Sequence, residues 1–223
     1  MLLLAIDTSG KYGSIALARC GPEESCKILD VVPLEVGTFS AQLIPQIALL
    51  LSKHGFGKQE IDAFAVASGP GSFTGLRVGL AAIKGLAEIL NKPIAAISLL
   101  EAVASAGSQH GEVIAALDAG RNDVYVGNYR VNSSIIRLGE QLLSLNEFLT
   151  AAAGRTIITP EKNIAEAARR ASISVEEIER PSSDAIARLG WEKIRAGETV
   201  TPEDLEANYI RRTDAEIFSK ISP

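Results

Sequence analysis

Hydrophobic positions in the first half of the chain fall into short runs bounded by turn-forming residues. Apolar or alternating runs predict β-strands at residues 2–7, 14–19, 27–34, 61–67 and 93–97. Apolar residues three or four apart predict helices over about residues 40–54, 73–91 and 98–107. The order of the first six elements is therefore three strands, a helix, a strand and a helix.

The same order begins again after residue 108. The pattern predicts strands at 112–118, 123–131, 134–140 and 155–159, a short helix at 144–153 and another helix that starts at Pro160. In each half a buried strand ends in an aspartate, Asp7 or Asp118, at the start of a hairpin. The sequence therefore predicts an α/β protein of two βββαβα lobes. The first covers residues 1–108 and is completed by a helix at 213–220, and the smaller second covers residues 109–212 and includes a helix at 182–196.

A glycine-rich turn at residues 68–75 joins the strand at 61–67 to the long helix at 73–91. Gly71 supplies conformational freedom, and Ser72 is placed to accept a hydrogen bond from the first free amides of the helix. Such a helix start favours an anion. The spacing matches neither a Walker loop nor the dinucleotide-binding fingerprint, because the Gly-Lys-Ser/Thr ending and the G-x-G-x-x-G spacing are both absent.

Small residues line one face of this long helix. Gly75 and Gly79 lie four apart, with Ala82 and Gly85 close to their face. Each glycine costs about 1 kcal/mol relative to alanine inside a helix, so close approach of another element is expected to offset that cost. The approaching element is either internal or part of a partner subunit. A second, apolar stripe suits the cover of a sheet: Leu76, Leu80, Ile83 and Ala87.

The paired aspartates suggest one chemical role and one structural role. Asp7 and Asp118 could face a nucleotide phosphate and its Mg²⁺ across a cleft, with amides and hydroxyls from Thr8, Ser9, Gly71 and Ser72 around the anion. Alternatively, each aspartate accepts hydrogen bonds from its own turn. The sequence contains no complete set of catalytic residues by spacing, so no catalytic residue is assigned.

Composition narrows the class of protein. The 223 residues carry a formal net charge of −5, which argues against strong binding of nucleic acid by this chain alone. The two histidines are isolated in sequence, so no metal site is expected. Cys20 and Cys26 flank a turn, and free thiols in a reducing cytoplasm are the expectation. No signal peptide and no membrane span is predicted.

Four segments and the chain ending resemble one family. They are residues 4–9, 40–45, 69–79 (GPGSFTGLRVG), 118–125 and 209–211. Together they resemble the TsaB (YeaZ) family, and the glycine-rich string is its most specific motif. The resemblance covers most of the chain and is densest in residues 1–130.

The resemblance implies an actin/Hsp70/sugar-kinase-like fold and a part in making threonylcarbamoyladenosine beside the tRNA anticodon. TsaB is the non-catalytic paralogue of TsaD, the catalytic subunit with which it dimerises, and TsaE, an ATPase, joins them. We therefore expect a scaffold or activator subunit that forms heterodimers or homodimers and meets tRNA only through the complex. No cofactor is required, although weak binding of ATP or ADP with Mg²⁺ stays open. The expected interface is Phe73, Gly75, Leu76, Gly79, Leu80, Ala82 and Ile83.

Two other functions remain open from the residues alone. A stand-alone ATPase or phosphotransferase of the same fold would bind nucleotide at Asp7 and turn it over. A peptidase would need a metal pair or a nucleophile paired with a base, and the sequence suggests neither. The accessory subunit is therefore the leading hypothesis.

Overall fold

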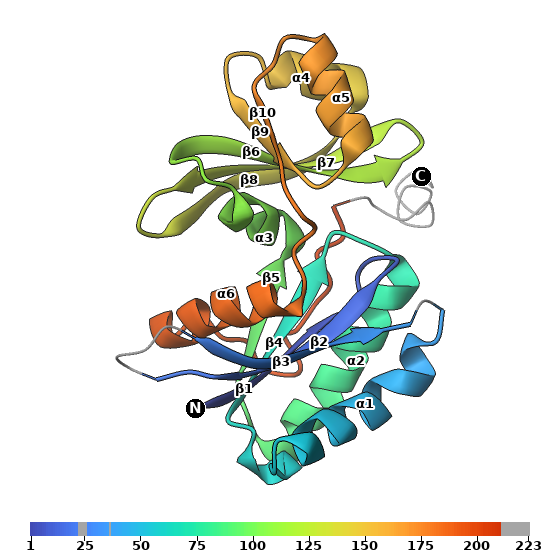
Figure 1. The fold of residues 1–223 in the computed structure, drawn as a ribbon, viewed down its shortest axis with the longest axis vertical. Helices are drawn as coiled ribbons and strands as arrows, with labels where there is room; N and C mark the ends of the chain where they lie inside the picture. The colour runs from blue at the N-terminus through green and yellow to red at the C-terminus, as the bar shows by residue number, and fades with distance from the viewer. Residues whose placement is uncertain (22–25, 36, 211–223) are drawn as a thin grey trace, which may run out of the picture. The chain divides into compact units, whose positions relative to one another are not determined.

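The computed structural model describes residues 1–21, 26–35 and 37–210, arranged in two compact units (Figure 1). The first unit consists of Met1–Ala102 together with Glu179–Ala207, and the second consists of residues 103–178 with 208–210. The chain therefore leaves the first unit after Ala102, returns to it at Glu179 and leaves it again after Ala207. The predicted helix at 213–220 lies outside the described residues.

The first unit contains a five-stranded sheet in the order β3-β2-β1-β4-β5. β1 runs antiparallel to β2 and parallel to β4, so the hairpins lie on one side of β1 and the crossover strands on the other. The strands are β1 (Leu2–Asp7), β2 (Gly13–Arg19), β3 (Lys27–Leu34), β4 (Ala63–Gly69) and β5 (Ile94–Ser98). The helices that follow in sequence are α1 (Phe39–Lys53), the short 3-10 turn η1 (Lys58–Glu60), α2 (Phe73–Leu90) and α3 (Leu99–Ala106).

The second unit repeats this arrangement. Read from β8, its strand order is β8-β7-β6-β9-β10, which matches β3-β2-β1-β4-β5 position by position. Its strands are β6 (Gly111–Gly120), β7 (Asp123–Val131), β8 (Ile135–Ser144), β9 (Thr156–Thr159) and β10 (Val175–Glu177). The helices α4 (Leu145–Ala151) and α5 (Lys162–Arg170) pack against a core on one face of this sheet. The duplicated βββαβα order predicted from the pattern is confirmed.

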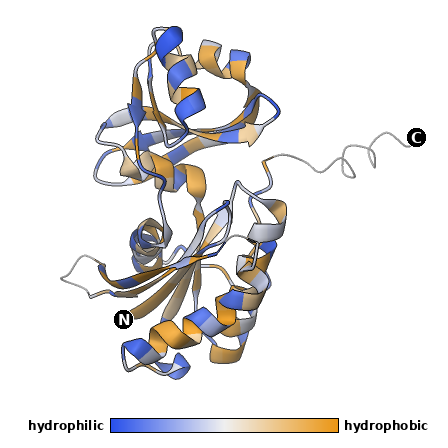
Figure 2. Ribbon diagram, turned by 45° about the vertical axis from the view of Figure 1, so that its right-hand side comes forward, coloured by the Kyte–Doolittle hydropathy of each residue, from blue (hydrophilic) through white to orange (hydrophobic). Residues whose placement is uncertain are grey.

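The first sheet has a large-residue face and a small-residue face, because side chains alternate along each strand. Large side chains such as Leu4, Ile15 and Phe64 join α1 and α2 in one hydrophobic core. The intervening residues, which point to the opposite face, are mostly buried alanines: Ala5, Ala16, Ala18, Ala63, Ala65 and Ala95. Figure 2 shows how strongly hydrophobic these strands are.

The small-residue face receives α6 (Ser183–Ala196), which packs across the first sheet (Figure 1). A methyl group on Gly190 of α6 would lie less than 3.0 Å from the Cβ of Ala65. Small residues on both sides therefore let this helix approach the sheet closely. This corrects the sequence-based division, which placed residues 182–196 in the second lobe.

Side-chain hydrogen bonds cap the starts of two helices, α2 and α4. Ser72 accepts a hydrogen bond from the backbone amide of Gly75 at the start of α2, as predicted. Ser144 and Glu147 form a reciprocal capping pair at the start of α4. The helix α1 starts at Phe39, and Thr38 precedes it without a side-chain cap. No helix in the described ranges is long and apolar enough to cross a membrane.

Candidate functional site

The glycine-rich turn after β4 is held against the turn that joins β1 to β2. The amide of Ser72 donates a 2.6 Å hydrogen bond to the carbonyl oxygen of Ser9. The Thr8 hydroxyl donates a 2.7 Å hydrogen bond to the carbonyl oxygen of Gly75. Amide and carbonyl groups at the start of α2 are thus bound by the chain itself.

The glycines of α2 are required by this contact. A methyl group on Gly75 would lie less than 3.0 Å from the carbonyl oxygen of Thr8, and one on Gly79 would lie equally close to the Thr8 hydroxyl oxygen. Gly71 meets the carbonyl oxygen of Ser9 in the same way. The close approach predicted for this helix face therefore exists, but a turn of the same unit makes it, not a second helix.

This packing corrects most of the expected partner interface. Leu76, Leu80 and Ile83 are buried in the core of the first unit, and Gly75 and Gly79 are buried beneath the β1–β2 turn. Buried side chains of a folded unit are not available to a partner. Phe73 is exposed and Ala82 is partly exposed, so these two alone of the seven lie at the surface.

The surface of α1 and α2 that faces away from the sheet carries large apolar side chains. Ile44 and Leu49 on α1 are 50% and 62% exposed, and Phe73 and Ile89 on α2 are 42% and 75% exposed. Ala81 and Gly85 are also exposed, and nothing lies within 4 Å of a methyl group built on Gly85. We call these six residues the outer face of α1 and α2. The sequence pattern did not predict this surface, because the glycines at 75 and 79 indicated a different face of α2.

Asp7 is buried at the end of β1 and is engaged by its own turn. Its Oδ1 atom accepts a 2.8 Å hydrogen bond from the amide of Ser9 and another from the Ser9 hydroxyl. Burial raises the pKa of the Asp7 carboxyl, and the hydrogen bonds from Ser9 and the nearby charge of Arg180 oppose that rise. These contacts favour the structural role, in which Asp7 stabilises the β1–β2 turn.

Asp118 occupies the matching place in the second unit but is exposed. Its Oδ1 atom accepts a 2.7 Å hydrogen bond from the amide of Gly120, two residues further on. Its Oδ2 atom accepts a 3.2 Å hydrogen bond from the side-chain amide of Asn163. Both aspartates therefore bond to the amide two residues ahead, which is the Asx-turn pattern.

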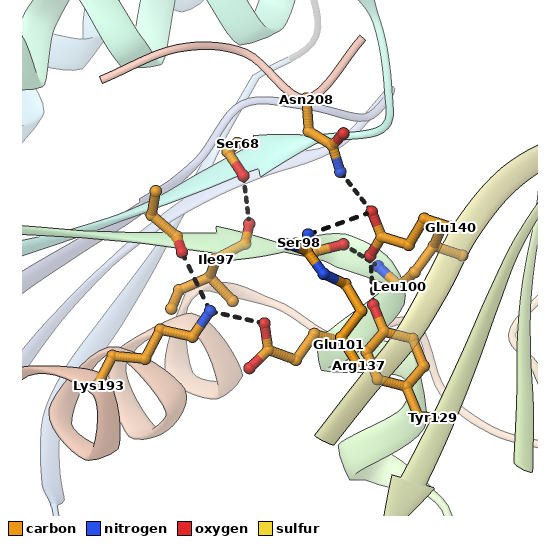
Figure 3. Close-up of polar contacts among 11 residues, drawn as sticks. Ser68, Ile97, Ser98, Leu100, Glu101, Tyr129, Arg137, Glu140, Lys193 and Asn208 are labelled. Carbon is orange, nitrogen blue, oxygen red and sulfur yellow. Dashed lines mark hydrogen bonds and ion pairs between the residues drawn. The ribbon is translucent and has the colours of Figure 1, made fainter. Parts of the chain in front are cut away.

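A polar cluster that the sequence did not predict surrounds Glu140 in the second unit (Figure 3). Glu140 accepts hydrogen bonds from the hydroxyl of the fully buried Tyr129 and, at 2.6 Å, from the side-chain amide of Asn208. It borders an open pocket of about 610 Å³ between the edge strand β8 and residues 208 and 210. Contacts over 68 residues of sequence leave no local signal. Among the described residues, no three His, Cys, Asp or Glu side chains are grouped to hold a metal.

Comparison with known proteins agrees with this architecture. The family model for TsaD, tRNA N6-adenosine threonylcarbamoyltransferase, matches residues 31–189. The crystal structure of YeaZ from Pseudomonas aeruginosa superposes with a TM-score of 0.73 at 25% identity, covering 93% of this chain and 100% of that one. The two sheets of identical strand order define the actin/Hsp70/sugar-kinase-like fold class.

Curated relatives carry the name TsaB, a tRNA threonylcarbamoyladenosine biosynthesis protein. The Haemophilus influenzae relative is 38% identical over 128 residues, which cover 56% of this chain and 52% of that protein. The Escherichia coli relative is 27% identical over 228 residues, which cover 96% of each chain. The chain thus spans about half of the first relative's length and nearly all of the second's. It belongs to the family described by the TsaD model and, within it, to the TsaB/YeaZ proteins.

Proposed function

We propose that this chain acts in tRNA threonylcarbamoyladenosine biosynthesis as a non-catalytic subunit that binds a TsaD-like catalytic subunit. The names of its curated relatives, tRNA threonylcarbamoyladenosine biosynthesis proteins, support the pathway. The partners follow from the family resemblance: a TsaD-like subunit, a TsaE-like ATPase that joins the pair, and tRNA bound through the assembled complex.

The outer face of α1 and α2 is the observation that carries the proposal. Among the described residues, eight large apolar side chains are exposed, and four of them lie on these two helices. Exposed apolar side chains concentrated on two neighbouring helices are typical of a site of protein–protein contact. The proposed interface still includes α2, as the sequence predicts, but it uses the outer face of that helix instead of the glycine face.

Charge and hydrogen bonding support an accessory role. The net charge of −5 gives this chain no general attraction for tRNA phosphates. Asp7, the residue at which a stand-alone ATPase would bind nucleotide, is already bonded to Ser9 within its own turn. The proposed subunit therefore contributes a binding surface, and the partner contributes the chemistry.

The test is gel filtration with light scattering of the chain alone and mixed with the TsaD-like protein of the same organism. ATP hydrolysis is measured on the same fractions. We expect a 1:1 heterodimer that displaces any homodimer, because one surface cannot hold two partners at once. We also expect no ATP hydrolysis by the chain alone. Separate elution of the two proteins would overturn the proposal, as would steady hydrolysis by the chain alone.

Surface variants locate the interface. Ile89→Glu places a charge on the outer face at a position that is 75% exposed, so the fold is expected to survive. We expect at least about a tenfold loss of affinity for the TsaD-like protein, since a charge is buried against apolar atoms. The matched control is Ile136→Glu on β8 of the second unit, which is 49% exposed. Equal effects of the two variants would contradict the assignment.

A further inference from the structure

The two cysteines lie opposite each other at the end of the β2–β3 hairpin. Arg19 and Lys27 are the last paired residues of the two strands, so Cys20 and Cys26 are the first residues beyond that pair, and their thiols are in hydrogen-bond contact. Both side chains are buried, with 1% and 3% of their surface exposed. The sequence shows only that they flank a turn, whereas the register brings them face to face.

Their positions are fixed on both sides. Cys20 exchanges backbone hydrogen bonds of 2.9 and 2.8 Å with Met1, next to β1. The Cys26 thiol lies 3.8 Å from the carbonyl oxygen of Ala187 on α6, and Arg188 donates a 3.2 Å hydrogen bond to the carbonyl oxygen of Cys26. Directly opposite residues of antiparallel strands have Cα atoms roughly 4.5–5.5 Å apart, which is within the range of about 4.4–6.8 Å that a disulfide spans.

Their surroundings make the two thiols unequal. A hydrogen bond between the two thiols lowers the pKa of Cys26, and the nearby Arg188 guanidinium lowers it further, against the effect of burial. The same hydrogen bond, together with burial, raises the pKa of Cys20. Cys26 is therefore the thiol that ionises first, and the thiolate is the nucleophilic form.

We propose that Cys20 and Cys26 are a redox modification site, at which a peroxide converts the two thiols into a reversible disulfide that joins the ends of β2 and β3. This site is independent of the partner interface on α1 and α2, and it lies on the opposite side of the first sheet, beside α6.

The reaction balances in two steps. The Cys26 thiolate attacks one oxygen of hydrogen peroxide, so that an S–O bond forms, the O–O bond breaks and hydroxide leaves, which gives a sulfenic acid. The Cys20 sulfur then attacks the Cys26 sulfur, the S–O bond breaks and the oxygen leaves as water after taking the Cys20 proton. In total two thiols are oxidised, and one peroxide is reduced to two waters. A small-molecule thiol such as glutathione reverses the reaction by exchange.

Burial shapes the expected behaviour. Both thiols are buried, so the reaction with peroxide is expected to be slower than for an exposed thiol. Because Cys20 lies opposite, the sulfenic acid is captured before a second peroxide can oxidise it further. The product closes a ring of seven residues and restricts opening of the hairpin beside α6.

The chain itself provides a convenient assay. Trypsin cuts after Arg19 and after Lys27, so residues 20–27 form one peptide that contains both cysteines. The reduced protein is treated with hydrogen peroxide, its remaining thiols are alkylated, and its tryptic peptides are measured by mass spectrometry. We expect this peptide to become lighter by about 2 Da, the mass of two hydrogens, and to carry no alkyl group. Treatment with glutathione is expected to restore the doubly alkylated peptide.

Variants test the order of attack. Cys20→Ser is expected to leave a sulfenic acid on Cys26 that dimedone traps. Arg188→Gln is expected to slow disulfide formation about two- to fivefold, because it lowers the thiolate fraction of Cys26. Arg195→Gln, on the exposed last turn of the same helix, is the matched control and is expected to react at the unchanged rate.

Three results would overturn the proposal. One is a peptide that stays doubly alkylated after excess peroxide, while a urea-unfolded sample confirms that the same peroxide dose oxidises the two thiols. Another is oxidation of both cysteines to sulfinic acid without a disulfide. The third is a disulfide between two chains as the main product. The first measurement uses the unmodified protein, so it stands even if a variant fails to fold.

Discussion

The two units share one strand order but differ in how deeply the turn after their first strand is buried. In the first unit the turn after Asp7 is buried beneath the start of α2, and Thr8 and Ser9 both bond to that helix. In the second unit the turn after Asp118 is exposed, and the aspartate bonds to its own turn and to Asn163 on α5. The duplicated topology therefore supports a tightly packed turn in one unit and an open turn in the other.

The difference shows that a repeated strand order does not dictate how closely the helix packs. Glycines at three positions let α2 lie against the backbone of the first turn. The first residues of α5 carry side chains, and Asn163 reaches Asp118 through its amide instead. Backbone contact in the first unit thus corresponds to side-chain contact in the second.

The largest expected effect comes from a single methyl group on α2. Gly75→Ala places a Cβ against the carbonyl oxygen of Thr8, so we expect a loss of about 3 kcal/mol in the free energy of unfolding. Gly139→Ala is the matched change on β8 of the second unit, where nothing lies within 4 Å, and it should be nearly neutral. Urea unfolding with hydrogen exchange resolves the two units. A neutral Gly75→Ala would break the comparison.

The paired aspartates give the next effect. Asp7→Ala leaves the Ser9 amide without its buried acceptor and is expected to lower the free energy of unfolding by about 2 kcal/mol. Asp118→Ala exposes the Gly120 amide to water instead, so it should lower that free energy by less than about 0.5 kcal/mol. Because the folded pKa of Asp7 is raised, its contribution is fully present below the unfolded value near 3.8 and falls as pH rises through the folded pKa. Asp7→Asn should remove this pH dependence, as urea unfolding at several pH values can measure. Equal costs for the two alanine variants would contradict the assignment.

A smaller difference is expected between the helix caps. The Ser144 hydroxyl accepts a hydrogen bond from the Glu147 amide and donates one to the Glu147 carboxylate. The Ser72 hydroxyl in the first unit only accepts a hydrogen bond, from the Gly75 amide. Ser144→Ala is expected to cost about 1 kcal/mol, and Ser72→Ala about half of that. Thermal unfolding measures both, and a larger loss for Ser72 would reverse this order.

The smallest expected effect concerns the edge strand of the first sheet. Lys53 and, secondarily, His54 hold the pKa of Asp30 on β3 down to about 2. A depressed folded pKa contributes stability above the unfolded value, near 3.8, that is lost as pH falls toward 2. The effect should stay under about 1 kcal/mol, because the groups are near the surface. Asp30→Asn should flatten this part of the pH profile, and an unchanged profile would count against the ion pair.

The sequence alone predicts most of the fold because its elements have strong local signals. Strands bounded by glycine and proline and helices with apolar stripes were located to within a few residues, and the two aspartates revealed the duplication. The placement of α6 was missed because it depends on the alternation of large and small residues along strands far away in sequence. The signal for the packing of α6 on the first sheet lies in small residues on both sides. They are the alanines that share a face with Ala65, and Ala187 and Gly190 of α6.

The candidate site was only partly predictable for a related reason. The need for close approach at Gly75 and Gly79 follows from the local cost of glycine, but the identity of the neighbour does not. The neighbour is Thr8, more than sixty residues earlier in the chain. Likewise, Asn208 meets Glu140 through tertiary packing alone. Local pattern therefore finds where contact is needed, and only the three-dimensional arrangement identifies what makes it.

The late position of α6 in the chain has a consequence for synthesis on the ribosome. The first sheet is complete once β5 has emerged, but the helix that covers its alanine face follows only after all five strands of the second sheet. At typical translation speeds of about 5–20 residues per second, that face stays open for roughly 5–20 seconds. The second sheet can form during this interval, while the nascent first unit offers an uncovered hydrophobic sheet to chaperones.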